Sequence, residues 1–351
     1  MFAKLYRGDA DVDFRKWWPR AMVLSLLLVA ISIGSFAVRG LNLGIDFEGG
    51  GVWEVPDENS SVADVRAALP AGKQDAKIQV VTGTEGRRIR VQSDLEELGP
   101  ESESVTLALA EQAGVGPEAV SVSLVGPSWG DEITKRTLQS LVAFFVLVAI
   151  YIAWRLEWKM AVGALVAVAH DIIISVGVYS IFQFEVTPAT AIAFLTIMGY
   201  SLYDTIVVYD KVRVNEARLG HRGRMTYADL MSMSMNQVLM RSINTTFTSV
   251  MPVLSMLLVG SLLLGAATLQ EFSVALLIGL LVGGYSSIFV AAPIVVLLKE
   301  REPHYREAKE RAKRAGDADT MARSVGDDAT TEVISSSGTI IQPKARKKRR
   351  H

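Results

Sequence analysis

The stretch MAVGALVAVAHDIIISVGVYSIF, from Met160 to Phe182, decides the fold class of this chain. It is apolar over the length that a helix needs to cross the hydrocarbon core of a bilayer, about 30 Å or about 20 residues. A soluble chain of 351 residues would instead show alternating apolar patterns in one or two domains. The stretch therefore predicts a membrane-spanning helix.

More apolar runs of similar length lie on both sides of this stretch, and 50% of the residues in the chain are hydrophobic. The runs that are long enough to span a bilayer are Met22–Val38, Leu138–Trp154, Met160–Phe182, Thr187–Val208, Ile243–Leu264 and Phe272–Leu298. The first run is too long for a cleaved signal peptide, and Arg39-Gly40 follows it where small residues would form the cleavage site. The predicted fold is an α-helical polytopic membrane protein with six spans.

Lys and Arg residues indicate the orientation of the spans, because they are enriched in cytoplasmic loops. They gather in the leader, in the turn at 155–159 and in the loop at about 210–241, but the turns after Phe182 and Leu264 carry none. We therefore expect both termini in the cytoplasm. The predicted parts are a leader (1–21), a first span (22–38), an extracytoplasmic domain (39–136), five spans (137–298) and a largely disordered tail (299–351).

The extracytoplasmic domain is acidic, with 17 Asp+Glu against 6 Lys+Arg between Leu41 and Thr134. Its apolar pattern predicts a small α+β domain of order β-α-β-β-α-β, the split arrangement of ferredoxin-like folds. The predicted elements are Gly51–Val55, Ser61–Leu69, Lys77–Val81, Arg87–Gln92, Ser102–Ala113 and Val120–Val125. We find no nucleophile–base pair, phosphate loop or ligand cluster in it, so the simplest interpretation is a binding or docking module.

Ionisable residues inside the predicted spans are the main candidates for a functional site, because charge in hydrocarbon is costly and usually functional. Asp204 lies in the fourth span, and polar residues recur along one face of the fifth span from Arg241. The candidates for a proton pathway are Asp204, Arg241, Ser201, Thr245, Thr248, His170 and Asp171. The alternatives are a structural ion pair between Asp204 and Arg241, and structural hydrogen bonding by His170 and Asp171.

Small residues recur every four positions on the sixth span, including Gly279, Gly283 and Ser287. This spacing favours close helix packing, either within the chain or against a partner subunit. The chain has no cysteine and four histidines, which excludes disulfides, Cys-ligated zinc and thiol catalysis. We expect no cofactor and no metal site.

The tail ends in the basic run Lys344–His351. The simplest interpretation is a solvated cytoplasmic segment, and the alternative is attraction to anionic lipid headgroups. No nucleic-acid partner is expected, because no aromatic residues interleave this run.

Three motifs in order make the chain similar to the SecF family of protein-export membrane proteins, within the RND superfamily. They are Gly44-Ile-Asp-Phe-Glu-Gly-Gly50, the stretch from Gly199 to Asn215 that contains Asp204, and Asn236-Gln237 followed by Arg241 and Asn244-Thr-Thr246. Tyr203 departs from the family pattern, in which many members have Asn beside the acid. The resemblance covers about Phe14 to Glu300.

This resemblance implies an auxiliary subunit of the Sec protein translocase and not an enzyme. The implied partners are SecD, the SecYEG translocon, the exported preprotein and YajC, and the implied location is the cytoplasmic membrane. The resemblance also implies that proton flow drives movement of the outer domain. Since Gly44, Gly49 and Gly50 flank Asp46 at the start of that domain, we expect this motif to act as a hinge, the alternative being close packing on the membrane surface.

Two other functions remain open. An RND-type exporter of lipids or small molecules usually has two six-span halves and larger outer domains. A passive scaffold of the translocon would not need Asp204.

Overall fold

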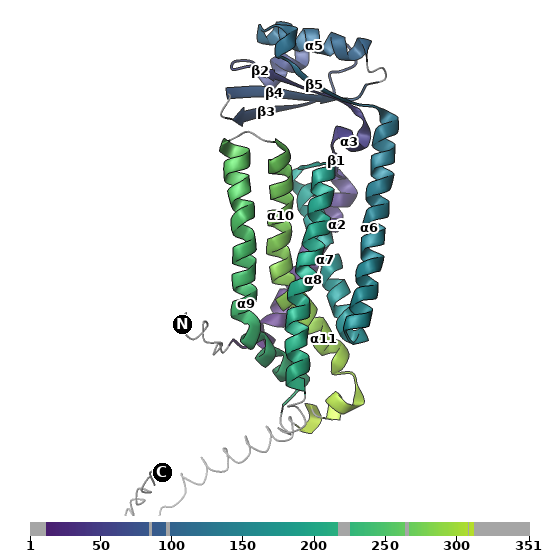
Figure 1. Cartoon of the computed structure of the whole chain (residues 1–351), viewed down its shortest axis with the longest axis vertical. Coiled ribbons are helices and arrows are strands. Elements are labelled where there is room, and N and C mark those ends of the chain that lie inside the picture. Colours follow the sequence, from purple (N-terminus) through teal and green to yellow (C-terminus); the bar gives the residue numbers. More distant parts are fainter. Residues whose placement is uncertain are drawn as a thin grey trace, which may run out of the picture.

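Long helices form a bundle, and a small sheet domain lies across one end of it in this computed structural model (Figure 1). The structure describes residues 12–83, 86–95, 99–216, 225–263, 267–307 and 309–311. The predictions for the first eleven residues of the leader, for the middle of the loop at about 210–241 and for the tail beyond Arg311 lie outside the described residues.

Within the described residues, six helices of the bundle are long and apolar enough to span a membrane, as the sequence predicts. Their bounds are α2 Phe14–Arg39, α6 Pro127–Arg155, α7 Trp158–Phe182, α8 Pro188–Glu216, α9 Tyr227–Ser255 with η3 Met256–Leu263, and α10 Ala267–Ser286 with η4 Ser287–Ala291 and α11 Ala292–Lys299. Several helices extend beyond the apolar runs: α2 begins inside the expected leader, and α8 and α9 leave a shorter connection than the expected loop.

Two π-helical segments interrupt the last two spans, and each lies close to a proline. Pro252 lies four residues before η3, and Pro293 lies two residues after η4. Proline has no N–H for the helical ladder and crowds the preceding turn, which accounts for the wider backbone of η4 before Pro293, whereas η3 follows Pro252. The widened turn at Ser287 brings its hydroxyl to the carbonyl of Gly283 at 3.0 Å.

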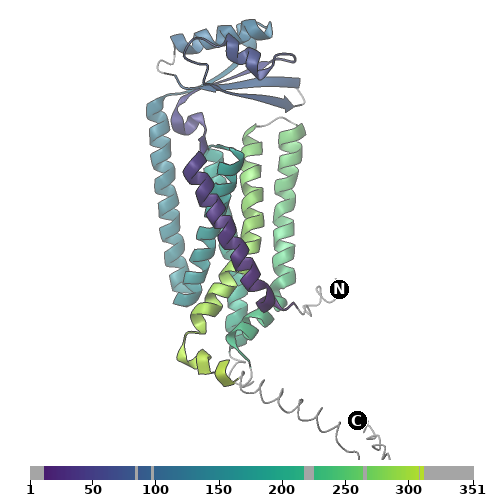
Figure 2. The ribbon, with the colours of Figure 1, turned by 180° about the vertical axis from the view of Figure 1, so that it is seen from behind.

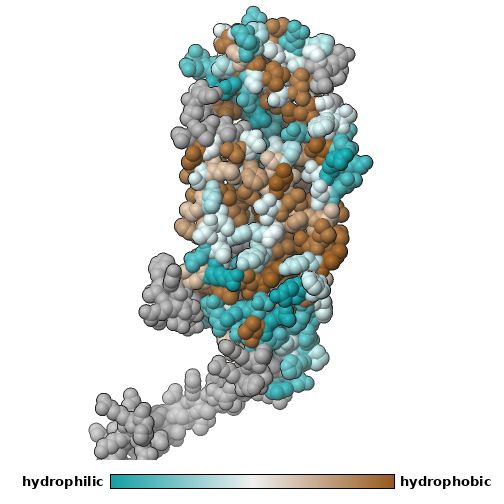
Figure 3. Space-filling model, viewed as in Figure 1, coloured by the Kyte–Doolittle hydropathy of each residue, from teal (hydrophilic) through white to brown (hydrophobic). Residues whose placement is uncertain are grey.

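On the face seen in Figure 3, apolar side chains mixed with residues of intermediate hydropathy cover the bundle, and hydrophilic side chains gather at the end away from the outer domain. From behind, α2 runs obliquely across the bundle (Figure 2). It packs against α7 so closely that a Cβ atom on Gly177 would lie 2.1 Å from the hydroxyl oxygen of Ser32. The outward side chains of α2 and α6 are largely exposed and apolar, which suits contact with lipid tails.

The outer domain has four antiparallel strands in the order β3-β4-β2-β5. Its elements are β2 Gly50–Pro56, α4 Val62–Ala68, β3 Lys77–Gly83, β4 Gly86–Ser93, α5 Pro100–Ala113, the 3₁₀ turn Pro117–Ala119 and β5 Ser121–Val125. This element order matches the predicted one, and the ferredoxin-like assignment stays a prediction. Ser61 begins α4 through a reciprocal capping box with Asp64.

The two helices cover one face of the sheet, and the opposite face is turned toward the bundle (Figure 1). Buried apolar side chains fill the space between α4, α5 and the strands, among them Trp53, Ile89, Val105 and Leu109. Trp53 also donates from Nε1 to Thr106 Oγ1 at 3.1 Å, so its one polar atom is paired inside this core.

A short segment connects the first span to the outer domain and is itself folded onto the bundle. Strand β1 (Asn42–Leu43) pairs in parallel with β6 (Glu185–Val186), and the one-turn helix α3 (Ile45–Glu48) follows. Gly50 has a φ of +111°, and a Cβ atom there would lie 2.6 Å from the carbonyl oxygen of Ser93. Only glycine fits this position without strain.

Candidate functional site

Asp204 lies inside the bundle on α8 and is 4% exposed. Its Oδ1 atom accepts a hydrogen bond from the hydroxyl of Ser242, on α9, at 2.8 Å. Its Oδ2 atom has no hydrogen-bond partner among the described residues. A carboxyl group in a membrane-spanning helix is a group that can take up a proton.

Arg241 precedes Ser242 on α9, but its side chain points to the surface of the bundle. Its Nη2 atom donates to the hydroxyl of Tyr203 at 3.0 Å, and the described residues include no ion pair between Arg241 and Asp204. Tyr203 is 54% exposed. The arginine is therefore held beside the acid by the neighbouring tyrosine and not by the acid itself.

The other two candidates on α9, Thr245 and Thr248, bond to their own helix. Thr245 donates to the carbonyl of Arg241 at 2.9 Å, and Thr248 donates to the carbonyl of Asn244 at 2.8 Å. In this arrangement neither hydroxyl reaches Asp204.

Asp171, on α7, is a second buried acid and is 1% exposed. Its Oδ2 atom accepts from Ser201 at 2.6 Å and from Ser286 at 2.8 Å, and its Oδ1 atom lies 3.1 Å from Nδ1 of His170. The Nε2 atom of His170 has no partner among the described residues. Helices α7, α8 and α10 thus meet at one carboxylate.

The small-residue stripe of the sixth span packs within the chain, against α8. A Cβ atom on Gly279 would lie 2.2 Å from Ile197, and one on Gly283 would lie 3.1 Å from Ser201. Ser287 contacts the hydroxyl of Thr205 at 3.0 Å. This close approach brings Ser286 to Asp171 and Ser287 to Thr205, the residue after Asp204.

Helices α8 and α9 also share an exposed polar face. It is formed by Thr196, Gly199 and Tyr203 on α8 and by Arg241, Asn244, Thr248 and Ser255 on α9. Beside it a groove of about 330 Å³ opens between α9 and α10, lined by Phe247 and Leu281 and reaching Ser242. Polar side chains at membrane depth must contact protein or water and not lipid tails.

The glycine motif Gly44–Gly50 lies at the end of the bundle that the outer domain contacts. A Cβ atom on Gly44 would lie 2.9 Å from Oε1 of Glu185. Asp46 is half-buried there, and burial raises its pKa although Arg90 opposes the shift. Gly49 has a φ of +82°, so the last residue before β2 and its first residue, Gly50, both have positive φ.

The site combines residues that the sequence singled out with others that it did not. Sequence reasoning missed Ser242 and Ser286 and noted Tyr203 only as a departure from the family pattern, and all three supply hydroxyl partners to the candidates. In the described parts of the chain, no group of three or more His, Cys, Asp or Glu side chains is arranged to hold a metal ion. Asp204 and Asp171 are buried carboxyl groups beside hydroxyl groups of neighbouring helices, a chemistry that can bind and release protons.

Two family models match the chain. The model described as protein export membrane protein SecD/SecF, C-terminal, matches residues 106–301, and the SecD/SecF GG motif matches residues 34–50. The protein translocase subunit SecF of Streptomyces coelicolor is 43% identical over 321 residues, which are 89% of this chain and 84% of that protein. The SecF subunit of Vibrio alginolyticus is 34% identical over 87% of this chain and 94% of that protein.

A solved structure has the same fold. The crystal structure of SecDF from Thermus thermophilus, a translocon-associated membrane protein, superimposes with a TM-score of 0.73 at 31% identity. The match covers 84% of this chain and 39% of the SecDF chain, so this chain spans about two-fifths of that longer protein.

Proposed function

Because the chain belongs to the SecD/SecF family of protein-export membrane proteins, we propose that it is a protein translocase subunit that uses the proton motive force to promote late steps of polypeptide export. Its role is transport and not catalysis of a covalent reaction. The observation that carries the proton-coupled part of this proposal is the burial of Asp204, an acid inside a membrane-spanning helix that bonds to a hydroxyl of the neighbouring helix and to no cation among the described residues.

Asp204 is the proposed proton carrier. A charge on this group inside the membrane is costly unless it is neutralised by a proton or by Arg241. Arg241 is next to Ser242, which bonds to Asp204, but points about 100° away around the helix, so a rotation of α9 would bring the cation toward the acid. Pairing in one state and release in another would alternate the proton affinity of Asp204.

Asp171 and His170 are proposed as a second proton-binding pair, with Ser201 between the two acids. Ser201 bonds to Asp171 and lies one turn before Asp204 on α8. One elementary charge that crosses 100 mV supplies about 2.3 kcal/mol. This is comparable to the few kcal/mol that separate two conformations of a protein.

The proposed partner subunit is SecD, and the exposed polar face of α8 and α9 is the surface that we expect it to cover. The relative from Thermus thermophilus is named protein translocase subunit SecDF, and this chain matches 38% of it. Gly199 lies on this face with no atom within 4 Å of a Cβ atom added to it. Gly199→Leu should therefore reduce co-purification of SecD and leave the isolated chain folded.

Further partners and the location are proposed from the same family membership. The partners are the SecYEG translocon, the exported preprotein, YajC and, through the basic tail, anionic lipids. The proposed location is the cytoplasmic membrane, with both termini in the cytoplasm. The outer domain is proposed to move during export, with the segment from Gly44 to Gly50 as its hinge.

The test is preprotein export by the native complex in membrane vesicles that carry a proton gradient. Asp204→Asn removes the titratable group and keeps its size, and it should abolish the stimulation of export by the gradient. The matched control is Asp210→Asn, because Asp210 lies at the exposed end of the same helix and pairs with Arg155 at 3.7 Å. Export that is equal in Asp204→Asn and wild type would favour a passive scaffold.

A further inference from the structure

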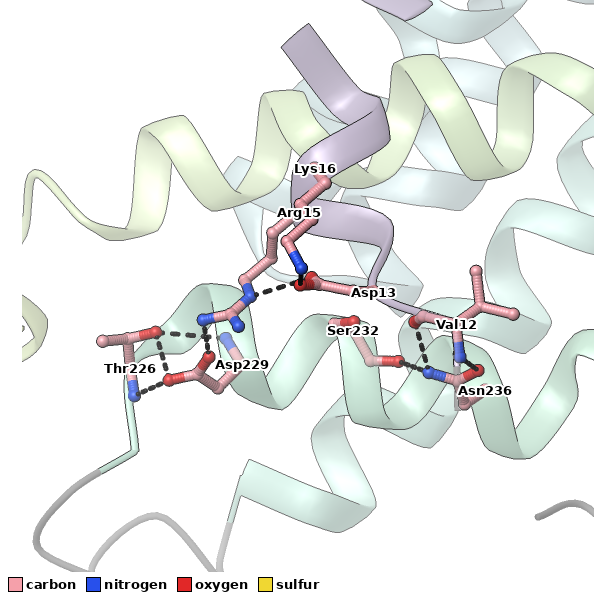
Figure 4. A network of polar contacts seen from close by, with 8 residues as sticks. All are labelled: Val12, Asp13, Arg15, Lys16, Thr226, Asp229, Ser232 and Asn236. Atoms are coloured by element: carbon pink, nitrogen blue, oxygen red, sulfur yellow. Dashed lines mark hydrogen bonds and ion pairs between the residues drawn. The ribbon is translucent and has the colours of Figure 1, made fainter. Parts of the chain in front are cut away.

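The first described residues of the leader contact the start of α9 at two points (Figure 4). At the first point the side-chain amide of Asn236 bonds to both backbone groups of Val12. The Val12 N–H donates to Asn236 Oδ1 at 3.0 Å, and Asn236 Nδ2 donates to the Val12 carbonyl at 2.9 Å. Because only backbone atoms of Val12 take part, this contact is independent of the side chain at position 12.

The second point lies two turns earlier on α9. Arg15 forms an ion pair with Oδ1 of Asp229, and the other carboxylate oxygen of Asp229 accepts the N–H and hydroxyl of Thr226 at 2.9 and 2.7 Å (Figure 4). Thr226 and Asp229 form the capping box that begins α9. The leader is therefore bound to the residues that determine where this helix starts. Phe14 and Trp18, both buried in the bundle core, hold the leader in place.

Gln237, the residue after Asn236 on α9, contacts helix α8. Gln237 Oε1 accepts a hydrogen bond at 3.0 Å from the side-chain amide of Asn215, which is fully buried near the end of α8. Adjacent residues on a helix point about 100° apart. Asn236 and Gln237 thus hold α9 from two sides, by the leader and by α8.

The contacts that Asn236 and Gln237 make lie just before Arg241 and Ser242, the residues of α9 beside Asp204. Arg241 and Ser242 follow Asn236 by five and six residues, which is about 7.5–9 Å along a helix. Ser242 bonds to Asp204 and Arg241 bonds to Tyr203. A rotation or shift of α9 at Asn236 would move both contacts together.

We propose that Asn236 is a positioning residue of the proton site: it binds the leader backbone at Val12 to α9, and the leader then acts as a strap that holds Ser242 and Arg241 in place beside Asp204. This inference rests on the proposed function, because its effect is exerted through Asp204. The strap consists of residues Val12 to Arg15.

The test uses the native complex in membrane vesicles and measures gradient-stimulated export against pH. Asn236→Leu removes both hydrogen bonds at similar size. Val12→Pro removes the N–H from the leader and leaves α9 unchanged. Val12→Ala keeps the backbone and is the control. We expect Asn236→Leu and Val12→Pro to lower stimulated export at least about fivefold and to shift its pH midpoint by at least about half a unit, with Val12→Ala as wild type.

Two outcomes would overturn the inference. Wild-type export and midpoint in both Asn236→Leu and Val12→Pro would mean that the strap is dispensable. A lower rate with an unchanged midpoint would mean that the contact serves only stability. If Asn236→Leu fails to accumulate, Val12→Pro decides between these results. Asp204→Asn in the same assay separates the two proposals: if it abolishes the stimulation and the strap variants do not, only the present inference fails.

Discussion

The Nη1 atom of Arg90, on strand β4 of the outer domain, lies 3.4 Å from Oε2 of Glu185, in the strand that precedes the fourth span. The same atom lies 3.8 Å from Oε1 of Glu271, at the start of α10. Both carboxylates belong to the bundle, and the side chains of Arg90 and Glu185 are only 18% and 9% exposed. One arginine thus joins the outer domain to two segments of the bundle.

Arg90→Met is expected to loosen this junction, because two largely buried carboxylates lose their shared cation. Breaking a buried pair costs up to 3–5 kcal/mol, and partial exposure here reduces the expected loss to about 2 kcal/mol in the free energy of unfolding. The thermal midpoint of the detergent-solubilised protein measures it. Arg136→Met is the control, since Arg136 is exposed and pairs with Glu132 one turn away. Equal midpoints for both variants would contradict the prediction.

Docking of the outer domain is expected to weaken as the pH rises. Burial is the largest influence on Glu185 and raises its pKa above the ordinary value of 4.5, although Arg90 and Lys77 oppose the shift and Asp46 and Glu48 add to it. An undocked Glu185 would be in water with an ordinary pKa, so docking takes up protons. Docking is therefore strongest below pH 4.5 and is lost as the pH rises through the raised pKa.

Distances between spin labels on Glu118→Cys and Phe182→Cys, one in the outer domain and one at the end of α7, would follow this docking in the otherwise cysteine-free chain. We expect the distribution to broaden with rising pH in the parent protein. Glu185→Gln, which resembles the protonated acid, should stay narrow. A distance distribution that broadens as the pH falls would contradict the prediction that docking weakens as the pH rises.

Gly279→Ala is expected to destabilise the bundle, because the added methyl group would overlap the buried and stiff side chain of Ile197. Overpacking of this kind costs about 1–3 kcal/mol. Gly199→Ala is the control in the same region: its Cβ atom meets open space, and alanine favours helix over glycine. The thermal midpoint in detergent should fall for Gly279→Ala and stay level or rise for Gly199→Ala. The reverse order would contradict the packing of α8 on α10.

Fixing the outer domain to the bundle is expected to stop gradient-stimulated export if that domain moves. Arg90→Cys and Glu271→Cys place thiols on the two sides of the junction, and a short cleavable crosslinker would join them. Export should stop after crosslinking and return after cleavage, compared with each single-cysteine variant under the same treatment. A crosslinked complex that exports at the normal rate would mean that Gly49 and Gly50 serve packing, as the approach of Gly50 to Ser93 permits.

Local patterns predicted the spans and the elements of the outer domain, because each depends on residues close in sequence. Span length follows from the hydrocarbon thickness, and strand alternation and the Ser61 cap act within a few residues. Asp204 and Asp171 were identifiable for the same reason, since an acid in an apolar run needs no structure to be noticed.

The hydrogen-bond and ion-pair partners of the candidate residues depend on packing between segments that are distant in sequence. Local sequence patterns contain no information about that packing. Ser286 bonds to Asp171 across 115 positions, and Arg90 bonds to Glu185 across two domains. The polar stripe that begins at Arg241 suggested which face of α9 reaches Asp204. The structure turns that stripe to the surface, and Ser242, about 100° around the helix, makes the contact instead.

Proton movement during export tests the central claim most directly. A pH-sensitive dye on the cytoplasmic side of membrane vesicles would report protons that cross the complex while preprotein is exported. We predict that the wild-type complex acidifies that side during export, that Asp204→Glu retains part of the signal, and that Asp204→Asn abolishes it with the complex still assembled. A proton signal in Asp204→Asn that equals the wild type would contradict the assignment of Asp204 as the proton carrier.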